Sequence, residues 1–179
     1  SRAHATMLGE CGIIPVRSAR RIVAELNRLE RRIAAGKFEF RAELEDIHMH
    51  LEQALTAALG EEGARLHTAR SRNDQIAVDL RLWLRDELDA LGQGVRNLQR
   101  ALVGQAAQHR SAIMPGFTHL QHAQPVLLAH HLLAYVEMFE RDRERLADCR
   151  RRVNVMPLGA GALAGTSLPI NRERVAELL

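Results

Sequence analysis

The chain has 179 residues, of which 46% are hydrophobic, enough for one or two small domains with a real core. Its 25 basic and 22 acidic residues are interleaved, so the pI near 9.5 indicates solvated helix faces and does not favour a nucleic-acid-binding stripe. No apolar run approaches the roughly 18 residues of a membrane span, no signal-peptide pattern is evident, and two distant cysteines imply no disulfide framework, so we expect a cytoplasmic protein.

The composition favours helices over strands. Aromatic residues make up only 3% of the chain, whereas Leu, Ala and Arg are abundant. Such a sequence suits helices packed through aliphatic side chains and disfavours a β-sandwich. We therefore expect an all-α protein built as a bundle of long helices.

The first part of the chain predicts helices separated by glycines. Residues 1–8, SRAHATML, are already in helical register, and a second helix begins near Ser18 and ends at Gly36. A further helix is expected from about Ala42 to Leu59. The apolar positions of these two helices are three or four residues apart: Ile22, Leu26, Leu29 and Ile33, then Leu44, Ile47, Leu51 and Leu55.

Two much longer helices follow. The first begins near Asp74 and continues to about His109, roughly 35 residues or about 50 Å. A turn at Pro115 and Gly116 precedes the second, which has Pro125 in its first turn and ends near Val153. Because their apolar positions repeat in heptad-like fashion, we expect these helices to pack in a bundle, partly against other subunits. An intramolecular helical hairpin is the alternative.

The end of the sequence predicts a loop and one short helix. PLGAGALAGTS, residues 157–167, is expected to be a loop, with the helix following from about Asn171. We divide the chain into an N-terminal helical domain (1–70) and a central helical-bundle domain (71–179). Both ends lie inside helical patterns, so we expect each domain to be incomplete at its outer end.

The stretch HTARSRNDQ (67–75) gathers polar side chains at the start of the first long helix. Ser71 and Asp74 have the spacing of a capping box, which accounts for those two residues. A cap does not account for Arg70, Arg72, Asn73 and Gln75, whose guanidinium and amide groups suit an anionic ligand, as do the free N–H groups of a helix N-terminus. The pattern predicts a carboxylate or phosphate site, with a plain helix cap as the alternative.

A second polar cluster, PGFTHLQHAQP (115–125), lies between the two long helices. Thr118 offers a hydroxyl, and His119 can transfer a proton near neutral pH. An ordinary solvated loop histidine is the alternative. His119 and His122 are spaced to share a metal, but no third ligand has convincing spacing, so we expect no metal site.

Two other stretches are weaker candidates for a functional site. In EDIHMH (45–50), His48 and His50 are two residues apart on an expected helix and therefore point in different directions. The glycines of residues 157–167 lack the GK[ST] signature and the preceding strand of a phosphate loop. We interpret that loop as a backbone turn packed closely against helices.

Taken together, HTARSRNDQ, PGFTHLQHAQP, PLGAGALAGT and EDIH resemble the argininosuccinate lyase family of the fumarase/aspartase superfamily, with LAYVEM typical of bacterial members. The resemblance covers nearly the whole chain in the same order and spacing. It implies a homotetrameric helical bundle with active sites shared between subunits, and a reversible β-elimination of argininosuccinate to arginine and fumarate, the last step of arginine biosynthesis. It implies no metal and no organic cofactor.

The resemblance also assigns roles to five residues. Ser71, Arg72 and Asn73 would bind the carboxylate end of the substrate, and Thr118 would bind a carboxylate from a neighbouring subunit. His119 would take part in proton transfer, as either acid or base.

Two parts of the family pattern are absent. The Gly-Ser-Ser loop that supplies the family's catalytic serine is not found, and neither is the extreme N-terminal segment with another substrate-binding serine. We therefore expect this chain alone to have negligible lyase activity. The alternatives are an inactive structural protein on the same scaffold, a lyase that releases fumarate from a different amine, or a plain helical interaction module.

Overall fold

The computed structural model describes residues 1–179 and confirms a mostly helical chain. It forms two compact units, one of residues 1–78 with 156–179 and the other of residues 79–155. The elements are α1 (Arg2–Glu10), α2 (Val16–Ala34), α3 (Ile47–Leu59), α4 (Glu61–Ala64), the 3-10 helix η1 (Arg65–His67), α5 (Arg72–Gln108), β1 (Ile113–Thr118), β2 (Gln121–Leu127), α6 (Leu128–Val153) and α7 (Arg172–Glu177). The division into helical domains at residue 70 that the sequence suggests stays a prediction.

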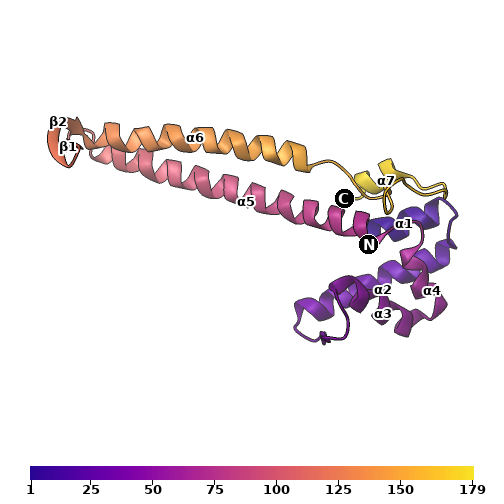
Figure 1. Ribbon diagram of the computed structural model, residues 1–179. Helices are drawn as coiled ribbons and strands as arrows, with labels where there is room; N and C mark the ends of the chain where they lie inside the picture. Colours follow the sequence, from indigo (N-terminus) through magenta and orange to yellow (C-terminus); the bar gives the residue numbers. More distant parts are fainter. The chain divides into compact units, whose positions relative to one another are not determined.

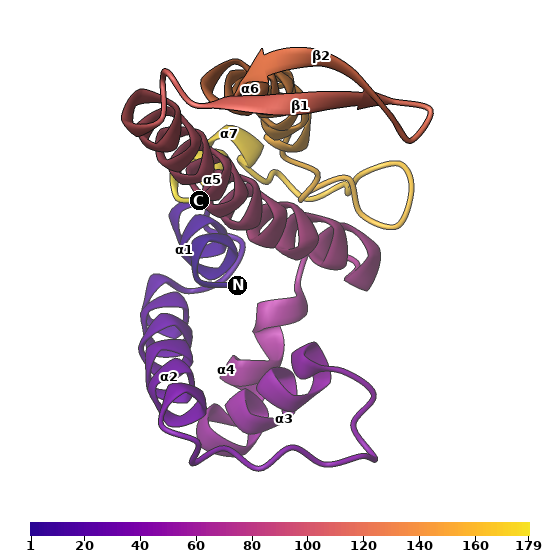
Figure 2. The ribbon, with the colours of Figure 1, turned by 90° about the vertical axis from the view of Figure 1, so that its left-hand side faces the viewer.

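The first unit has its core between α1 and α2, with α3 and α4 beside α2 (Figure 2). Of the four apolar residues expected on one face of α2, Ile22, Leu26 and Leu29 are buried and Ile33 is only partly buried, while Ala19 is buried in addition. Met7 and Leu8 of α1, the helix that packs against α2, are also buried. Burial of such aliphatic side chains is the main stabilising contribution to this unit.

The helix expected from Ala42 begins later, at Ile47. Asp46 caps it, because its side chain accepts a hydrogen bond of 2.7 Å from the backbone N–H of Met49. The cap overrides the apolar periodicity that suggested the earlier start. Asn171 likewise caps α7 by accepting from the N–H of Arg174, so the short last helix is confirmed.

The second unit consists mainly of α6 and the larger part of α5, which run side by side in opposite directions (Figure 1). Gln99 of α5 donates to the backbone oxygen of Val136 and to Glu140, both in α6. Arg150 of α6 is paired with Asp89 of α5. The two long helices are therefore confirmed, and α5 lies within two residues of its expected limits.

A β-hairpin replaces the turn expected between these helices. β1 and β2 pair antiparallel, with Pro115 opposite Pro125 and an irregularity between Pro115 and Phe117. The expectation that Pro125 starts the second long helix is wrong, since α6 begins at Leu128 and Pro125 lies in β2. Proline is tolerated in an edge strand or at a bulge, and in a two-stranded sheet both strands are edges.

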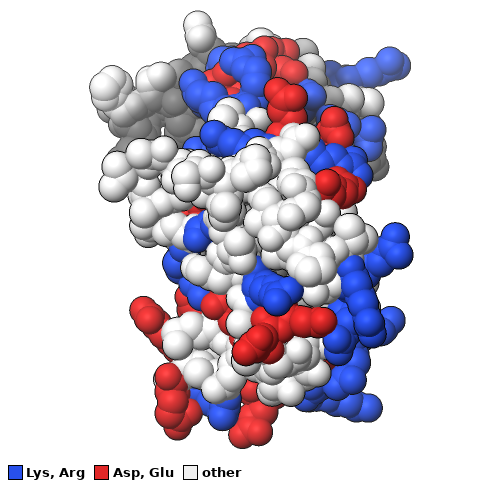
Figure 3. Space-filling view, turned by 90° about the vertical axis from the view of Figure 1, so that its right-hand side faces the viewer, with Lys and Arg blue, Asp and Glu red and all other residues white.

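No helix combines the length and the apolar character needed to cross a membrane. On the face drawn in Figure 3, basic and acidic side chains both occur. The mixture agrees with the interleaved charges of the sequence.

Candidate functional site

The start of α5 has the capping geometry that the sequence predicts. The hydroxyl of Ser71 accepts a hydrogen bond of 3.2 Å from the N–H of Asn73, and the N–H of Ser71 donates to Asp74 Oδ1 at 3.0 Å. These two bonds satisfy backbone groups that the first helical turn leaves without partners. They hold the backbone of residues 71–74 in one conformation.

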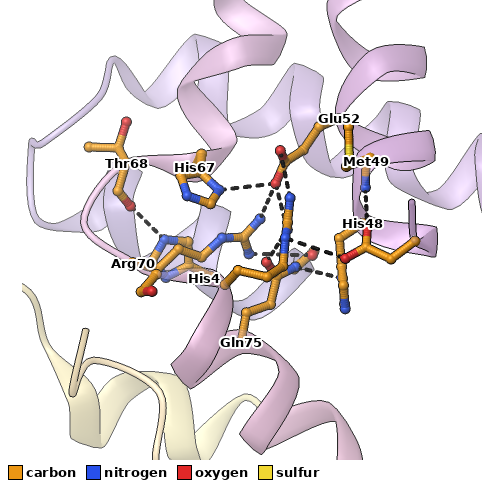
Figure 4. Close-up of polar contacts among 12 residues, drawn as sticks. His4, His48, Met49, Glu52, His67, Thr68, Arg70 and Gln75 are labelled. Atoms are coloured by element: carbon orange, nitrogen blue, oxygen red, sulfur yellow. Dashed lines mark hydrogen bonds and ion pairs between the residues drawn. The ribbon is translucent and has the colours of Figure 1, made fainter. Parts of the chain in front are cut away.

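The carboxylate of Glu52 in α3 lies beside this turn and contacts two arginines and a histidine (Figure 4). Its two carboxylate oxygens accept from the two terminal nitrogens of Arg72 at 2.9 and 3.0 Å. The Nη2 atom of Arg70, whose side chain is 1% exposed, lies 3.5 Å from Glu52 Oε1, and His67 Nδ1 lies 3.1 Å from the same oxygen. A bidentate carboxylate pair fixes a guanidinium plane as well as its charge.

The charges around Glu52 keep it ionised. Partial burial acts to raise the pKa of its carboxyl, but hydrogen bonds from Arg72 and His67 outweigh burial, so this pKa lies below its usual value. Glu52 was not among the residues that the sequence singled out. It lies 20 positions before Arg72 and belongs to no local motif, so only the fold brings the two together.

Asn73 differs from its neighbours because its side chain makes no hydrogen bond within the chain. It is exposed, and its amide makes no hydrogen bond to other residues of the structure. Arg72, by contrast, is held by Glu52 and by the Gln75 amide oxygen at 2.5 Å. Of the three residues predicted at this end of the site, Asn73 therefore has the side chain most available to a ligand.

Histidines surround the cluster in different environments. His48 Nδ1 lies 2.9 Å from the Gln75 amide nitrogen, so it faces the cluster, whereas His50 accepts from the N–H of Arg41 on another side of α3. The expectation that these two histidines point in different directions is confirmed. The ring of His48 brings a further polar group next to the residues at the start of α5.

His4 is a buried histidine of the same unit. It is 1% exposed, and its Nε2 lies 2.8 Å from the Thr68 carbonyl oxygen, which requires the proton on Nε2 in the neutral ring (Figure 4). Burial, together with the nearby Arg70 charge, lowers the pKa of His4 from 6.5 to about 4. His4 is therefore neutral at pH 7 and donates to the segment that leads into Ser71.

Thr118 and His119 lie in the other unit, at the end of the β-hairpin. Thr118 pairs with Gln121, so His119 and Leu120 form a two-residue turn, and both have positive φ, 50° and 62°. All of these side chains are exposed. The structure thus describes the two predicted motifs in separate units, and the 37-residue helix α5 separates them along the chain.

No group of three or more His, Cys, Asp or Glu side chains is placed to hold a metal ion. His122, considered with His119 as a metal pair, instead packs its ring on Phe117, with ring centroids 4.7 Å apart.

Comparison with known proteins reveals a family. The family described as Lyase matches residues 2–179. Proteins named argininosuccinate lyase from Pelotomaculum thermopropionicum and Geobacter sulfurreducens are 60% and 58% identical over all 179 residues. These residues correspond to 39% of each relative, so the chain spans about two fifths of the length of the curated relatives it matches.

Solved structures have the same fold. A structure of EDDS lyase in complex with formate matches 99% of this chain and 35% of its own, with a TM-score of 0.85 and 33% identity. Fumarate lyase from Mesorhizobium sp. BNC1 matches 98% of this chain and 41% of its own, with a TM-score of 0.75 and 30% identity.

Proposed function

Because the chain belongs to the lyase family, we propose that the protein it forms is an argininosuccinate lyase. The reaction would be a reversible β-elimination of argininosuccinate to arginine and fumarate, in arginine biosynthesis. The observation that carries this proposal is the ordered polar cluster at the start of α5, within a chain 60% identical to a relative of that name. The proposal extends to a cytoplasmic location, where Cys11 and Cys149 would remain free thiols.

The chemistry explains why such a cluster is useful. A base removes a proton next to a carboxylate, and the resulting carbanion spreads its charge into that carboxylate. Donors fixed beforehand stabilise this additional negative charge without reorganisation. The Asn73 amide, the Ser71 hydroxyl and the N–H groups of the first turn of α5 are donors of this kind.

Arg72 would act as a guanidinium of fixed orientation that a substrate carboxylate shares with Glu52. Its guanidinium is already bonded to Glu52, so a substrate carboxylate would meet a cation whose orientation is fixed. We propose Ser71, Arg72 and Asn73 as the substrate-binding residues of this chain.

Thr118 and His119 would complete the site from another subunit. Thr118 would bind a substrate carboxylate, and His119 would transfer a proton, either as the base or as the acid that protonates the leaving nitrogen. Their exposed position at the end of a hairpin leaves them free to approach a neighbouring subunit.

Assembly into a homotetramer would bring the motifs together. α6 is 26 residues long and has no buried residue, so its apolar side chains lack the cover that a bundle would supply. We also propose that the 179 residues alone have negligible activity, because they represent 39% of the relatives' length.

The test is an assay of fumarate release from argininosuccinate by the complete protein that carries these residues. We expect turnover in the wild type and a loss of about 10²–10⁴-fold in His119→Ala, the usual effect of removing an acid or base group. His109→Ala, which changes another exposed histidine, should keep full activity. A folded protein without turnover of argininosuccinate would contradict the proposal, and assays with other fumarate-releasing amines would identify a related lyase.

A further inference from the structure

The glycine-rich loop of residues 157–165 is bound by a buried carboxylate. Asp74, in the first turn of α5, is 3% exposed. Its Oδ2 accepts two hydrogen bonds from this loop, one of 3.0 Å from the N–H of Gly159 and one of 2.8 Å from the N–H of Gly161. Hydrogen bonds from backbone N–H groups to a buried carboxylate are among the stronger ones in proteins.

Two glycines give the loop the shape that this carboxylate requires. Gly159 and Gly161 have φ values of 96° and 64°, where other residues are strained. A Cβ atom on Gly161 would lie 2.7 Å from the backbone oxygen of Gly165. Backbone N–H groups that converge in this way form a concave anion site, and here the anion is a side chain of the same chain.

The other oxygen of Asp74 faces the candidate substrate residues. Oδ1 accepts from the N–H of Ser71, and Ser71 in turn accepts from the N–H of Asn73. The loop is also held at its base by Arg172, which donates to the carbonyl oxygens of Leu158 and Met156. A single carboxylate thus connects two segments 85 and more residues apart in sequence.

We propose that Asp74 is a positioning residue, which joins the loop 157–165 to Ser71 and Asn73 so that the two segments move as one. The loop then fixes the backbone around the substrate-binding residues. The connection follows from geometry alone, whereas its effect on substrate binding rests on the function proposed above.

The connection is tested by amide hydrogen exchange in the complete protein. Asn has one acceptor oxygen, so Asp74→Asn must deprive either Ser71 or the Gly159 and Gly161 pair of its acceptor. We expect at least one of these two sets of amides to exchange about tenfold faster, with core amides of α2 unchanged. Asp86→Asn, an exposed aspartate on the same helix, should leave all of them unchanged. Wild-type exchange at both sets in Asp74→Asn would overturn the proposal.

If Asp74→Asn does not fold, a second variant, Gly161→Ala, tests the same connection. This variant disturbs the loop and leaves Asp74 in place. Because the segments are joined, the Ser71 amide should exchange about tenfold faster in this variant. Gly104→Ala, where a Cβ would meet open space, is the control and should not alter Ser71. Unchanged exchange at Ser71 in Gly161→Ala would overturn the proposal.

Steady-state kinetics of Asp74→Asn distinguish a role of Asp74 in positioning the substrate-binding residues from a role in folding alone. In the complete enzyme, Asp74→Asn should raise KM for argininosuccinate about tenfold while kcat per folded enzyme changes about threefold or less, because substrate binding is what the proposal affects. A lower kcat with unchanged KM would overturn the role in the site. If the wild type does not act on argininosuccinate, the proposed function fails, and hydrogen exchange still decides whether Asp74 joins the segments.

Discussion

At the scale of single residues, His4 makes the stability of the chain depend on pH. The pKa of its imidazole is about 4 in the folded protein, against 6.5 for an unperturbed histidine in an unfolded chain, so the unfolded state binds more protons between these values. The stabilising effect of a neutral His4 is complete above pH 6.5 and is lost as the pH falls toward 4. Since one pKa unit corresponds to about 1.4 kcal/mol, the loss is on the order of 3 kcal/mol.

We therefore predict that His4→Gln flattens the dependence of unfolding free energy on pH between 6.5 and 4. Urea unfolding monitored by circular dichroism at pH 7.0, 6.0, 5.0 and 4.5 measures the unfolding free energy at each pH. His122→Gln removes an exposed histidine and should keep the wild-type slope. An identical slope in His4→Gln would show that His4 is not responsible.

Glu52 is a second residue whose role can be measured. Glu52→Gln removes the negative charge that lies 3.5 Å from Arg70 Nη2 and replaces the bidentate bond to Arg72. Because hydrogen bonds to charged groups contribute about 1.5–3 kcal/mol, we predict a loss of unfolding free energy of that order.

The measurement is the urea midpoint at pH 7. Glu43→Gln changes an exposed glutamate that precedes the same helix and should leave the midpoint within error. Equal midpoints for the two variants would contradict a structural role for Glu52.

These residues also show what sequence patterns can predict. The spacing of Ser71 and Asp74 predicts a cap, because both residues lie within one helical turn. In the structure Asp74 accepts from the N–H of Ser71, and the Ser71 hydroxyl accepts from the N–H of Asn73. The contacts of Asp74 with the glycine loop and of Glu52 with Arg72 join distant parts of the chain, and no local pattern indicates them. The assignments of Ser71, Arg72, Asn73, Thr118 and His119 to a substrate remain predictions.

At the scale of elements, the helices follow from apolar periodicity, whereas the hairpin does not. Pro115, Gly116 and Pro125 are strong turn and helix-start signals, and they suggested a turn followed directly by a helix. In the structure the two prolines are cross-strand neighbours in a two-stranded sheet. Short strands without an alternating pattern have no periodic signal, so sequence alone could not reveal them.

The turn of this hairpin contains backbone strain at Leu120, which a glycine at that position would remove. Leu120 has a φ of 62° and is 98% exposed, so it has an unfavourable backbone conformation and no packing to offset it. Left-handed backbone costs a non-glycine residue roughly 1–2 kcal/mol, and glycine avoids this cost. We predict that Leu120→Gly stabilises the hairpin by about 1 kcal/mol.

Hydrogen exchange of the β1 and β2 amides measures this change, and exchange should be slower in the variant. Leu163→Gly is the matched control, since Leu163 is 90% exposed but is not among the residues with positive φ. That variant should leave the hairpin amides unchanged. Faster exchange of the hairpin in Leu120→Gly would contradict the interpretation.

At the scale of the whole molecule, both long helices have large apolar side chains that are exposed. In α5, Trp83, Leu91 and Leu98 are 57%, 56% and 44% exposed. In α6, Tyr135 and Met138 are 42% and 47% exposed. Extended apolar surfaces of this kind indicate sites of association.

We predict that the protein associates through these helices and that Leu91→Lys combined with Leu98→Lys weakens the association. The two leucines are seven residues apart and share one face of α5, so the double change places two charges in the proposed contact. Sedimentation equilibrium should show a shift toward monomer, with unchanged helix content by circular dichroism. Gln105→Lys with Gln108→Lys adds the same charge at exposed polar positions and should leave the association intact. A wild type that stays monomeric would contradict the predicted association. A double leucine variant that associates as tightly as wild type would exclude Leu91 and Leu98 from the contact.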